Sequence, residues 1–359
     1  MEVEPLSALD MFFPAAAETG LPDTLWRDAS PSLAREVFDR ISRQPLSPAA
    51  RALSVRVLAT GANAPSGAGS DADLAAARAN ALIALGQAEG AARILDRAPG
   101  QTRNEPLSRA AAEAFLRTAR PERACETARD LTVDRERVYW LRLRAFCQAL
   151  DGQADAAAVT FSLANQTERD AVFSRLMSAL LAGGGNPGTA SFRNGLEIAL
   201  SRRLGLGDPP AASPPPIVSD ALSAEVAGLL TDPGAIDRQF EALAAATAPA
   251  ARTRIARRIL ILAAVGAAVT DEQRARIAAL DGGRSGAPTG WLLALSDAAA
   301  AGQMGQTALA ALWIAQAAGP AGPATADRVL VIAALRRVGL SEDARNFALE
   351  GLAALADPR

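Results

Sequence analysis

The chain has 359 residues, a formal net charge of −2, no histidine and only two cysteines. Without histidine, no Ser-His-Asp or Cys-His catalytic unit can form, and the common zinc ligand sets need more cysteines than this chain has. The nearly balanced charge provides no general attraction to nucleic acid or to anionic lipid. We therefore expect a protein that is not an enzyme and has no catalytic residues, cofactor or metal.

The composition predicts an all-α fold. Half of the residues are hydrophobic but only 4% are aromatic, and much of the apolar content is alanine, the strongest helix former. Alternating Val, Ile, Thr and Tyr runs of the kind that form strands are not found. The longest apolar run, ILILAAVGAAV (259–269), is about half the roughly 20 residues that a bilayer requires, so we expect a buried helix there and no membrane span.

Helix starts and chain breaks suggest how the chain is organised. Ser30-Pro31 and Ser47-Pro48 place a capping hydroxyl before a proline at the first helical position. Two stretches interrupt the helical pattern, GANAPSGAGSD (61–71) and the proline-rich GLGDPPAASPPPIV (205–218), which no helix can cross. We expect an N-terminal helical cap (1–62), a repeat lobe (71–204), a Pro-rich linker (205–218) and a second helical lobe (219–359).

A short pattern recurs within the expected repeat lobe. Gly152 is followed five residues later by Ala157 and nine residues later by Phe161, and similar sets follow three other small residues. The leading positions are Gly86, Ala119, Gly152 and Gly185, which are evenly spaced along the chain. Near the C-terminus the pattern recurs at Gly339, and a weaker copy begins at Gly302. This spacing predicts an array of helical hairpins in which each leading residue lies at the turn between two helices.

The pattern resembles the tetratricopeptide repeat, in which a Gly ends the first helix and an Ala lets the second pack closely. The best match is ALIALGQAEGAARILDRAPG (81–100), and the resemblance covers about 71–200 well and 290–356 loosely. The first helices depart from the family, since Ala and Arg mostly replace the expected Trp and Leu-Gly. The tract is also similar to secreted helical-repeat proteins of alphaproteobacteria of unassigned function, and to the non-catalytic superhelical arm of soluble lytic transglycosylases. The alternative is chance spacing in an alanine-rich chain.

The resemblance implies an α-solenoid of antiparallel hairpins in two lobes, whose concave surface holds another chain. We therefore expect a scaffold or adaptor for protein–protein interaction. Two alternatives are a structural component of a larger envelope-associated assembly and the accessory domain of an enzyme. An enzyme using paired carboxylates such as Asp151 and Asp155 is a further rival.

The two cysteines form a candidate disulfide. In the repeat register, Cys125 and Cys147 lie on adjacent antiparallel helices with a vertical offset of about 3 Å, within disulfide reach if their Cβ atoms converge. The alternative is two buried thiols. A disulfide would imply an oxidising compartment, so we expect a periplasmic protein. The N-terminus MEVEPLSALDMFFP lacks the basic and apolar regions of a signal peptide as given, which makes the cytoplasm the alternative.

A row of arginines is the candidate partner-binding site. In tetratricopeptide arrays the fifth position of each first helix lines the concave groove, and here those positions are Arg109, Arg142 and Arg175, with Tyr139 and Glu113 nearby. Guanidinium groups favour carboxylates, phosphates or an acidic peptide segment. The alternative is a solvated helix face. We expect the partner to be another protein or an acidic peptide segment.

Overall fold

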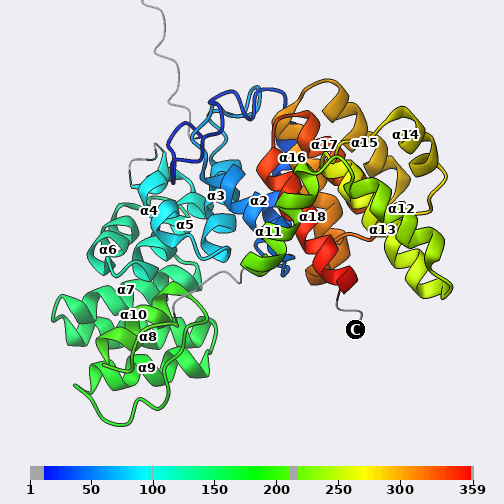
Figure 1. Ribbon diagram of the computed structural model, residues 1–359. Coiled ribbons are helices and arrows are strands. Elements are labelled where there is room, and N and C mark those ends of the chain that lie inside the picture. The colour runs from blue at the N-terminus through cyan, green and yellow to red at the C-terminus, as the bar shows by residue number, and fades with distance from the viewer. Residues whose placement is uncertain (1–11, 97, 99, 211–216, 357–359) are drawn as a thin grey trace, which may run out of the picture. The chain divides into compact units, whose positions relative to one another are not determined.

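The computed structural model describes residues 12–96, 98, 100–210 and 217–356, which form eighteen α-helices, two short 3₁₀-helices and no strand (Figure 1). The expected all-α class is confirmed. None of the helices in these residues combines the length and the apolar character that a membrane crossing requires.

The described residues divide into two compact units, neither of which is continuous in sequence. The first unit comprises residues 12–18 and 59–210, and the second comprises residues 19–58 and 217–356. Helix α1 (Pro31–Ile41) and all but the last residue of α2 (Pro48–Ala59) therefore belong to the second unit, although they lie in the segment expected to form an N-terminal cap. Residues 211–216 of the proline-rich linker lie outside the described residues.

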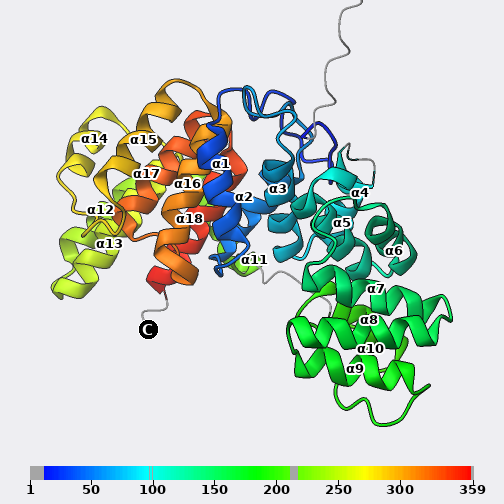
Figure 2. The ribbon, with the colours of Figure 1, turned by 180° about the vertical axis from the view of Figure 1, so that it is seen from behind.

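The first unit is built from helical hairpins with regular starts (Figures 1 and 2). Its helices are α3 (Ala72–Ala84), α4 (Ala88–Leu95), α5 (Glu105–Arg117), α6 (Pro121–Asp130), α7 (Val138–Leu150), α8 (Ala154–Thr167), α9 (Ala171–Leu181) and α10 (Gly195–Arg203). The first helices α3, α5, α7 and α9 start at positions 72, 105, 138 and 171, which are evenly spaced. The helix starts therefore follow the interval seen in the sequence.

A residue in the left-handed backbone conformation ends each of these first helices. Gly86, Ala119 and Gly152 have φ angles of 79°, 57° and 75°, and each lies two residues beyond its helix. After α7, the Gly152 amide donates to Ala149 O and the next amide donates to Gln148 O, at 3.3 and 2.8 Å. These two bonds satisfy carbonyls that the helix end would leave free.

The fourth turn differs from the sequence prediction. Gly183, with φ 68°, lies two residues beyond α9 and takes the position that was predicted for Gly185. The shift arises because α9 has 11 residues, whereas α3, α5 and α7 have 13 each. A connection without regular secondary structure then leads to α10.

Helix α5 is the central helix of the first unit. It packs against α3, α4, α6 and α10, and its four alanines Ala110, Ala111, Ala112 and Ala114 are all fully buried. Alanine side chains allow neighbouring helices to come close on several sides at once. Helix α10 returns to α5 although four other helices separate the two in sequence, and this return was not anticipated from the repeat pattern.

The second unit contains α1, α2 and the C-terminal helices. These are α11 (Asp220–Thr231), α12 (Ala235–Ala245), α13 (Pro249–Val265), α14 (Asp271–Ala278), α15 (Thr289–Ala300), α16 (Met304–Ala318), α17 (Thr325–Arg337) and α18 (Ser341–Ala356). Ser30 caps α1 as predicted, since its side chain accepts from the Leu33 amide. Helix α1 packs on α16, where Gln316 Nε2 donates to Val37 O at 3.1 Å (Figure 2).

Trp291 and Trp313 are both half-buried. Their rings are stacked, with centroids 4.1 Å apart, and the Arg40 guanidinium lies 4.8 Å from the Trp313 ring centroid. Trp313 Nε1 also donates to Glu36 at 2.8 Å. These contacts fix α1 against α16 at the surface of the second unit, not inside it.

Two opposite substitutions test the turn geometry. Gly152 and Ala119 both have positive φ at equivalent turns, and both are exposed. A side chain in this conformation costs about 1–2 kcal/mol, partly offset by the lower entropy of the unfolded chain. Gly152→Ala should therefore lower, and Ala119→Gly should raise, the free energy of unfolding by about 1 kcal/mol in urea titrations. Shifts of the same sign in both variants would contradict this account.

Candidate functional site

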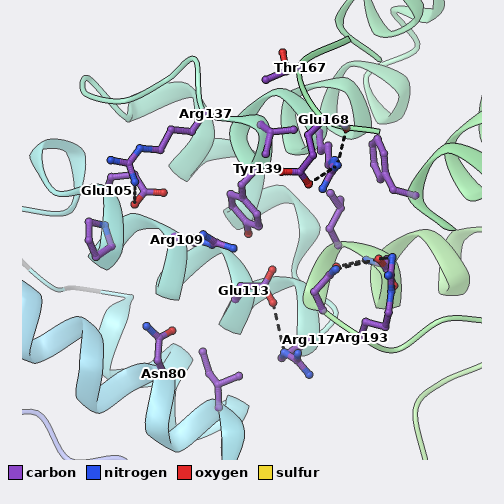
Figure 3. Close-up of a pocket in the computed structure, with 18 of the residues that line it drawn as sticks. Asn80, Glu105, Arg109, Glu113, Arg117, Arg137, Tyr139, Thr167, Glu168 and Arg193 are labelled. Atoms are coloured by element: carbon purple, nitrogen blue, oxygen red, sulfur yellow. Dashed lines mark hydrogen bonds and ion pairs between the residues drawn. The ribbon is translucent and has the colours of Figure 1, made fainter. Parts of the chain in front are cut away.

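The first unit contains a cavity of about 930 Å³ (Figure 3). We call it the charged cavity. Its walls come from the first helices α3, α5, α7 and α9, from the end of α8, from the loops that precede α7, α9 and α10, and from the start of α10. The cavity is of the size that binding sites commonly have.

Ten of the lining residues carry formal charge, and the charges balance. The arginines are Arg109, Arg117, Arg137, Arg142 and Arg193, and the acidic residues are Glu105, Glu113, Glu136, Glu168 and Glu197. Five positive and five negative side chains give a net charge of zero. The wall of the cavity is thus strongly polar without a dominant sign.

Four of the five arginines are paired with carboxylates of the wall. The nitrogen–oxygen distances are 3.6 Å for Arg117–Glu113, 3.5 Å for Arg137–Glu105, 3.1 Å for Arg142–Glu168 and 2.9 Å for Arg193–Glu197. These side chains therefore compensate one another's charge within the protein.

Arg109 is the exception. Among the residues that the structure describes, no carboxylate lies within 4 Å of its guanidinium, which is exposed and stacks on Tyr139 with 4.7 Å between Cζ and the ring centroid. The Tyr139 ring in turn makes an edge contact with Trp140 at 5.1 Å, and Trp140 Nε1 donates to Glu105 at 3.1 Å. The pair of Tyr139 and Trp140 therefore supports the one arginine of the cavity wall that has no ion pair among the described residues.

The hydroxyl of Tyr139 points toward Glu113 (Figure 3). This hydroxyl is buried, and among the described residues no acceptor or donor meets it with full hydrogen-bond geometry, although Glu113 is close enough to act on it. Burial raises the pKa of Tyr139 well above its ordinary value, the negative charge of Glu113 adds to the increase, and Arg109 opposes it. Glu113 itself accepts from the Gly195 amide at 2.7 Å, so it also holds the first turn of α10.

A second charged cluster fixes the start of α10. Arg193 donates to both carboxylate oxygens of Asp170, at 2.8 and 2.9 Å, and also pairs with the buried Glu197. Asp170 caps α9 by accepting from the Val172 and Phe173 amides. The starts of α9 and α10 are therefore joined, and this joint forms one wall of the charged cavity.

The structure brings together some of the predicted partner-binding residues but not all of them. Arg109, Tyr139 and Arg142 line the charged cavity, whereas Arg175 is not part of its lining. The Arg175 guanidinium donates to the carbonyl of Thr189 in the connection before α10, at 2.8 Å. Arg142 is engaged as well, because it donates to the main chain and to the side chain of Glu168.

Several residues of the cavity wall were not predicted from the sequence. Arg193, Asn194, Leu196 and Glu197 enter the cavity because α10 packs on α5, and the Gly195–Glu113 hydrogen bond joins residues 82 positions apart. The short-range pattern carries no signal for such a return. The acidic residues Glu105 and Glu168 could have been found from the repeat register, since each lies near the start of the first helix of a hairpin.

The two cysteines lie at disulfide distance, in agreement with the pairing expected from the repeat register. The Sγ atoms of Cys125 and Cys147 are 1.98 Å apart and the Cα atoms are 5.6 Å apart. Cys125 belongs to α6 and Cys147 to α7, and both are buried. The pair therefore joins the hairpin that carries Arg109 to the helix that carries Tyr139.

Comparison of the chain with protein-family models, with curated proteins and with solved structures gives no match. Within the described residues, no group of His, Cys, Asp or Glu side chains has the arrangement needed to hold a metal ion. Asp151 and Asp155, the carboxylates considered for an enzyme, are both exposed and do not line the charged cavity. The site is thus defined by its own ion pairs and by Arg109.

Because Tyr139 is the only tyrosine of the chain, its ionisation can be followed directly. Its pKa is raised in the folded state, so absorbance at 295 nm should show a midpoint above 10, and a midpoint of about 10 in urea. The neutral phenol then stabilises the fold fully below pH 10, and this contribution disappears as pH rises through the folded pKa.

Two variants check the cause of this shift. Arg109→Gln should raise the midpoint further and Glu113→Gln should lower it, while the midpoints in urea stay equal, because the charges act only in the folded state. Circular dichroism at each pH verifies that the chain is still folded. A folded midpoint near the ordinary value would show that the hydroxyl is solvated.

Thiol chemistry tests the cysteine pair. Protein unfolded without reductant should contain no alkylatable thiol, and reduction should destabilise the fold by about 3 kcal/mol for a loop closed across 22 residues. The double variant Cys125→Ala/Cys147→Ala is the matched control, because reductant should leave its melting temperature unchanged. Two alkylated thiols in the unreduced protein would exclude the bond.

Proposed function

We propose that the protein is a non-enzymatic scaffold or adaptor that holds a segment of another protein in the charged cavity. The observation that carries this proposal is the cavity wall itself. It runs over the first helices α3, α5, α7 and α9, eight of its ten charged side chains are paired with one another, and the stacked Arg109 has no ion pair among the described residues. Pre-organised side chains lose little entropy on binding, which favours a binding role.

A peptide segment fits this wall better than a small apolar ligand. The wall has five positive and five negative side chains, together with the Asn80 and Asn194 amides. A polypeptide presents N–H donors, carbonyl acceptors and side chains of either sign, so it can satisfy such a mixed surface. Drug-sized ligands usually occupy sites lined mainly by apolar side chains.

The positions of the helix boundaries also favour a solenoid fold, which suits a scaffold function. We interpret the first unit as a tetratricopeptide-like solenoid, because its first helices start at even intervals and end in equivalent turns. In such solenoids the first helices face the concave surface, where partner chains bind. In this interpretation, Arg109, Tyr139 and Arg142 belong to that surface. The second unit would be a lobe with degenerate repeats.

We also propose that the protein works in the periplasm. The support is the cysteine pair at disulfide distance, since disulfides persist in oxidising compartments and are rare in the bacterial cytoplasm. Fractionation of cells, followed by thiol alkylation of each fraction, tests this location. Recovery of reduced protein from the cytoplasmic fraction would contradict it.

Site-specific crosslinking in cells tests the scaffold function. Asn80 is exposed and lines the charged cavity, whereas Ser162 is exposed on α8 and lies outside the cavity lining. A photo-crosslinking amino acid at position 80 should capture one partner chain reproducibly, and the same amino acid at position 162 should not. Asn80→Trp introduces a large side chain at the cavity wall, so it should compete with the partner and reduce capture by a crosslinker placed at position 106. The same products from positions 80 and 162, or no product from position 80, would contradict the proposal.

A further inference from the structure

The charge balance of the cavity indicates what kind of segment it accepts. Four arginines are paired with glutamates of the wall, which leaves Arg109 as the single uncompensated cation among the described lining residues. We infer that Arg109 binds one carboxylate, on an acidic side chain of an extended partner segment, and that the cavity selects against runs of acidic residues. This inference rests on the proposed function and specifies its ligand.

The geometry of Arg109 suits a carboxylate. The Tyr139 ring covers one face of the guanidinium at 4.7 Å, and no described residue accepts from the in-plane N–H groups. A carboxylate can accept two of these N–H groups side by side, which is the strong form of this interaction. The stacked position restricts the arginine before the ligand arrives, so less side-chain entropy is lost on binding.

The rest of the wall opposes a second negative charge. Another anion would meet arginines that already hold carboxylates of the protein, at 2.9 to 3.6 Å. It would have to displace one of these carboxylates or lie beside it. Both arrangements bring like charges together, which disfavours binding. A phosphate, with nearly two charges at neutral pH, is disfavoured for the same reason.

An unpaired acidic residue strengthens this selectivity. Glu136 lines the cavity and has no ion pair within 4 Å among the described residues, although the charge of Arg144, outside the lining, acts on it. The charges of the wall that have no ion pair within the wall are therefore one arginine and one glutamate. A segment with one acidic residue flanked by neutral or basic residues complements both, whereas a continuous acidic run places a carboxylate against Glu136.

The test uses capped five-residue peptides and the arginine Nε–H signals of ¹⁵N-labelled protein. The Arg109 signal is assigned as the one lost in Arg109→Gln. Peptide GSESG, acetylated and amidated at its ends, should shift the Arg109 signal in a saturable way at millimolar concentration. Replacing its glutamate with glutamine (GSQSG) should weaken binding by about 10-fold or more, because the charged hydrogen bonds are lost. Adding salt should also weaken it, since an exposed charge pair is screened.

Protein variants provide the matched control. Arg109→Gln should weaken GSESG by about 10-fold to 100-fold, as judged from the shifts of the other arginine signals. Arg175→Gln removes the same group outside the cavity lining and should change affinity by about twofold or less. If Arg109, Arg142 and Arg175 were equivalent binding residues, Arg109→Gln and Arg175→Gln would lower the affinity for GSESG equally.

Three results of the peptide titrations would contradict the inference. It is overturned if no capped peptide gives a saturable shift, if GEEEG or a phosphoserine peptide binds more tightly than GSESG, or if only GSGSG with a free C-terminal carboxylate binds. Crosslinking from position 80 distinguishes failure of the scaffold function from failure of the role inferred for Arg109. A partner captured equally well by wild type and Arg109→Gln would leave the scaffold function intact and remove the role of Arg109.

Discussion

Helix α10 can lie against α5 only because Gly195 has no side chain. A Cβ atom at this position would lie 2.9 Å from Glu113 O and 3.0 Å from the Leu116 Cβ, closer than atoms pack. The contact is completed by Arg202, whose Nη1 donates to Leu116 O at 2.9 Å and to Arg117 O at 3.0 Å. This single close approach converts an open helical face into a walled cavity, because it brings Leu196 and Glu197 to the cavity lining.

The same contact explains how charge is distributed in the cavity. Glu113 accepts the first amide of α10 at 2.7 Å and also pairs with Arg117, so its carboxylate has a structural role. Arg142 donates to Glu168 and is likewise occupied. Partly buried ions need such partners, because an unpaired charge that loses water is costly. Arg109 is exposed and stays hydrated, so it can remain unpaired and available to a ligand.

The second unit shows how distant segments are joined by buried charge. Arg328 pairs with Glu350 at 2.7 Å, and the other oxygen of Glu350 accepts from the Ala49 amide at 2.8 Å. Arg56 pairs with Asp343 at 2.6 Å. Removing one member would leave the other buried without its partner, so α2 and α18 depend on each other. In the first unit the cysteine pair has the comparable function of joining α6 to α7.

Local chemistry in the sequence determined the helical class, the even spacing of the first helices, the proximity of Cys125 and Cys147, and the nearness of Arg109 to Tyr139. Each of these depends on helix geometry or on neighbouring hairpins, which short-range patterns encode. Tertiary structure decided which charged side chains of the cavity are paired and how the cavity is walled. Arg142 is neutralised by a glutamate 26 residues away, α10 is fixed by Glu113 over 82 residues, and α1 joins Gln316 over 279 residues. Such contacts depend on packing between distant helices, and nothing in the local spacing specifies which distant groups will meet.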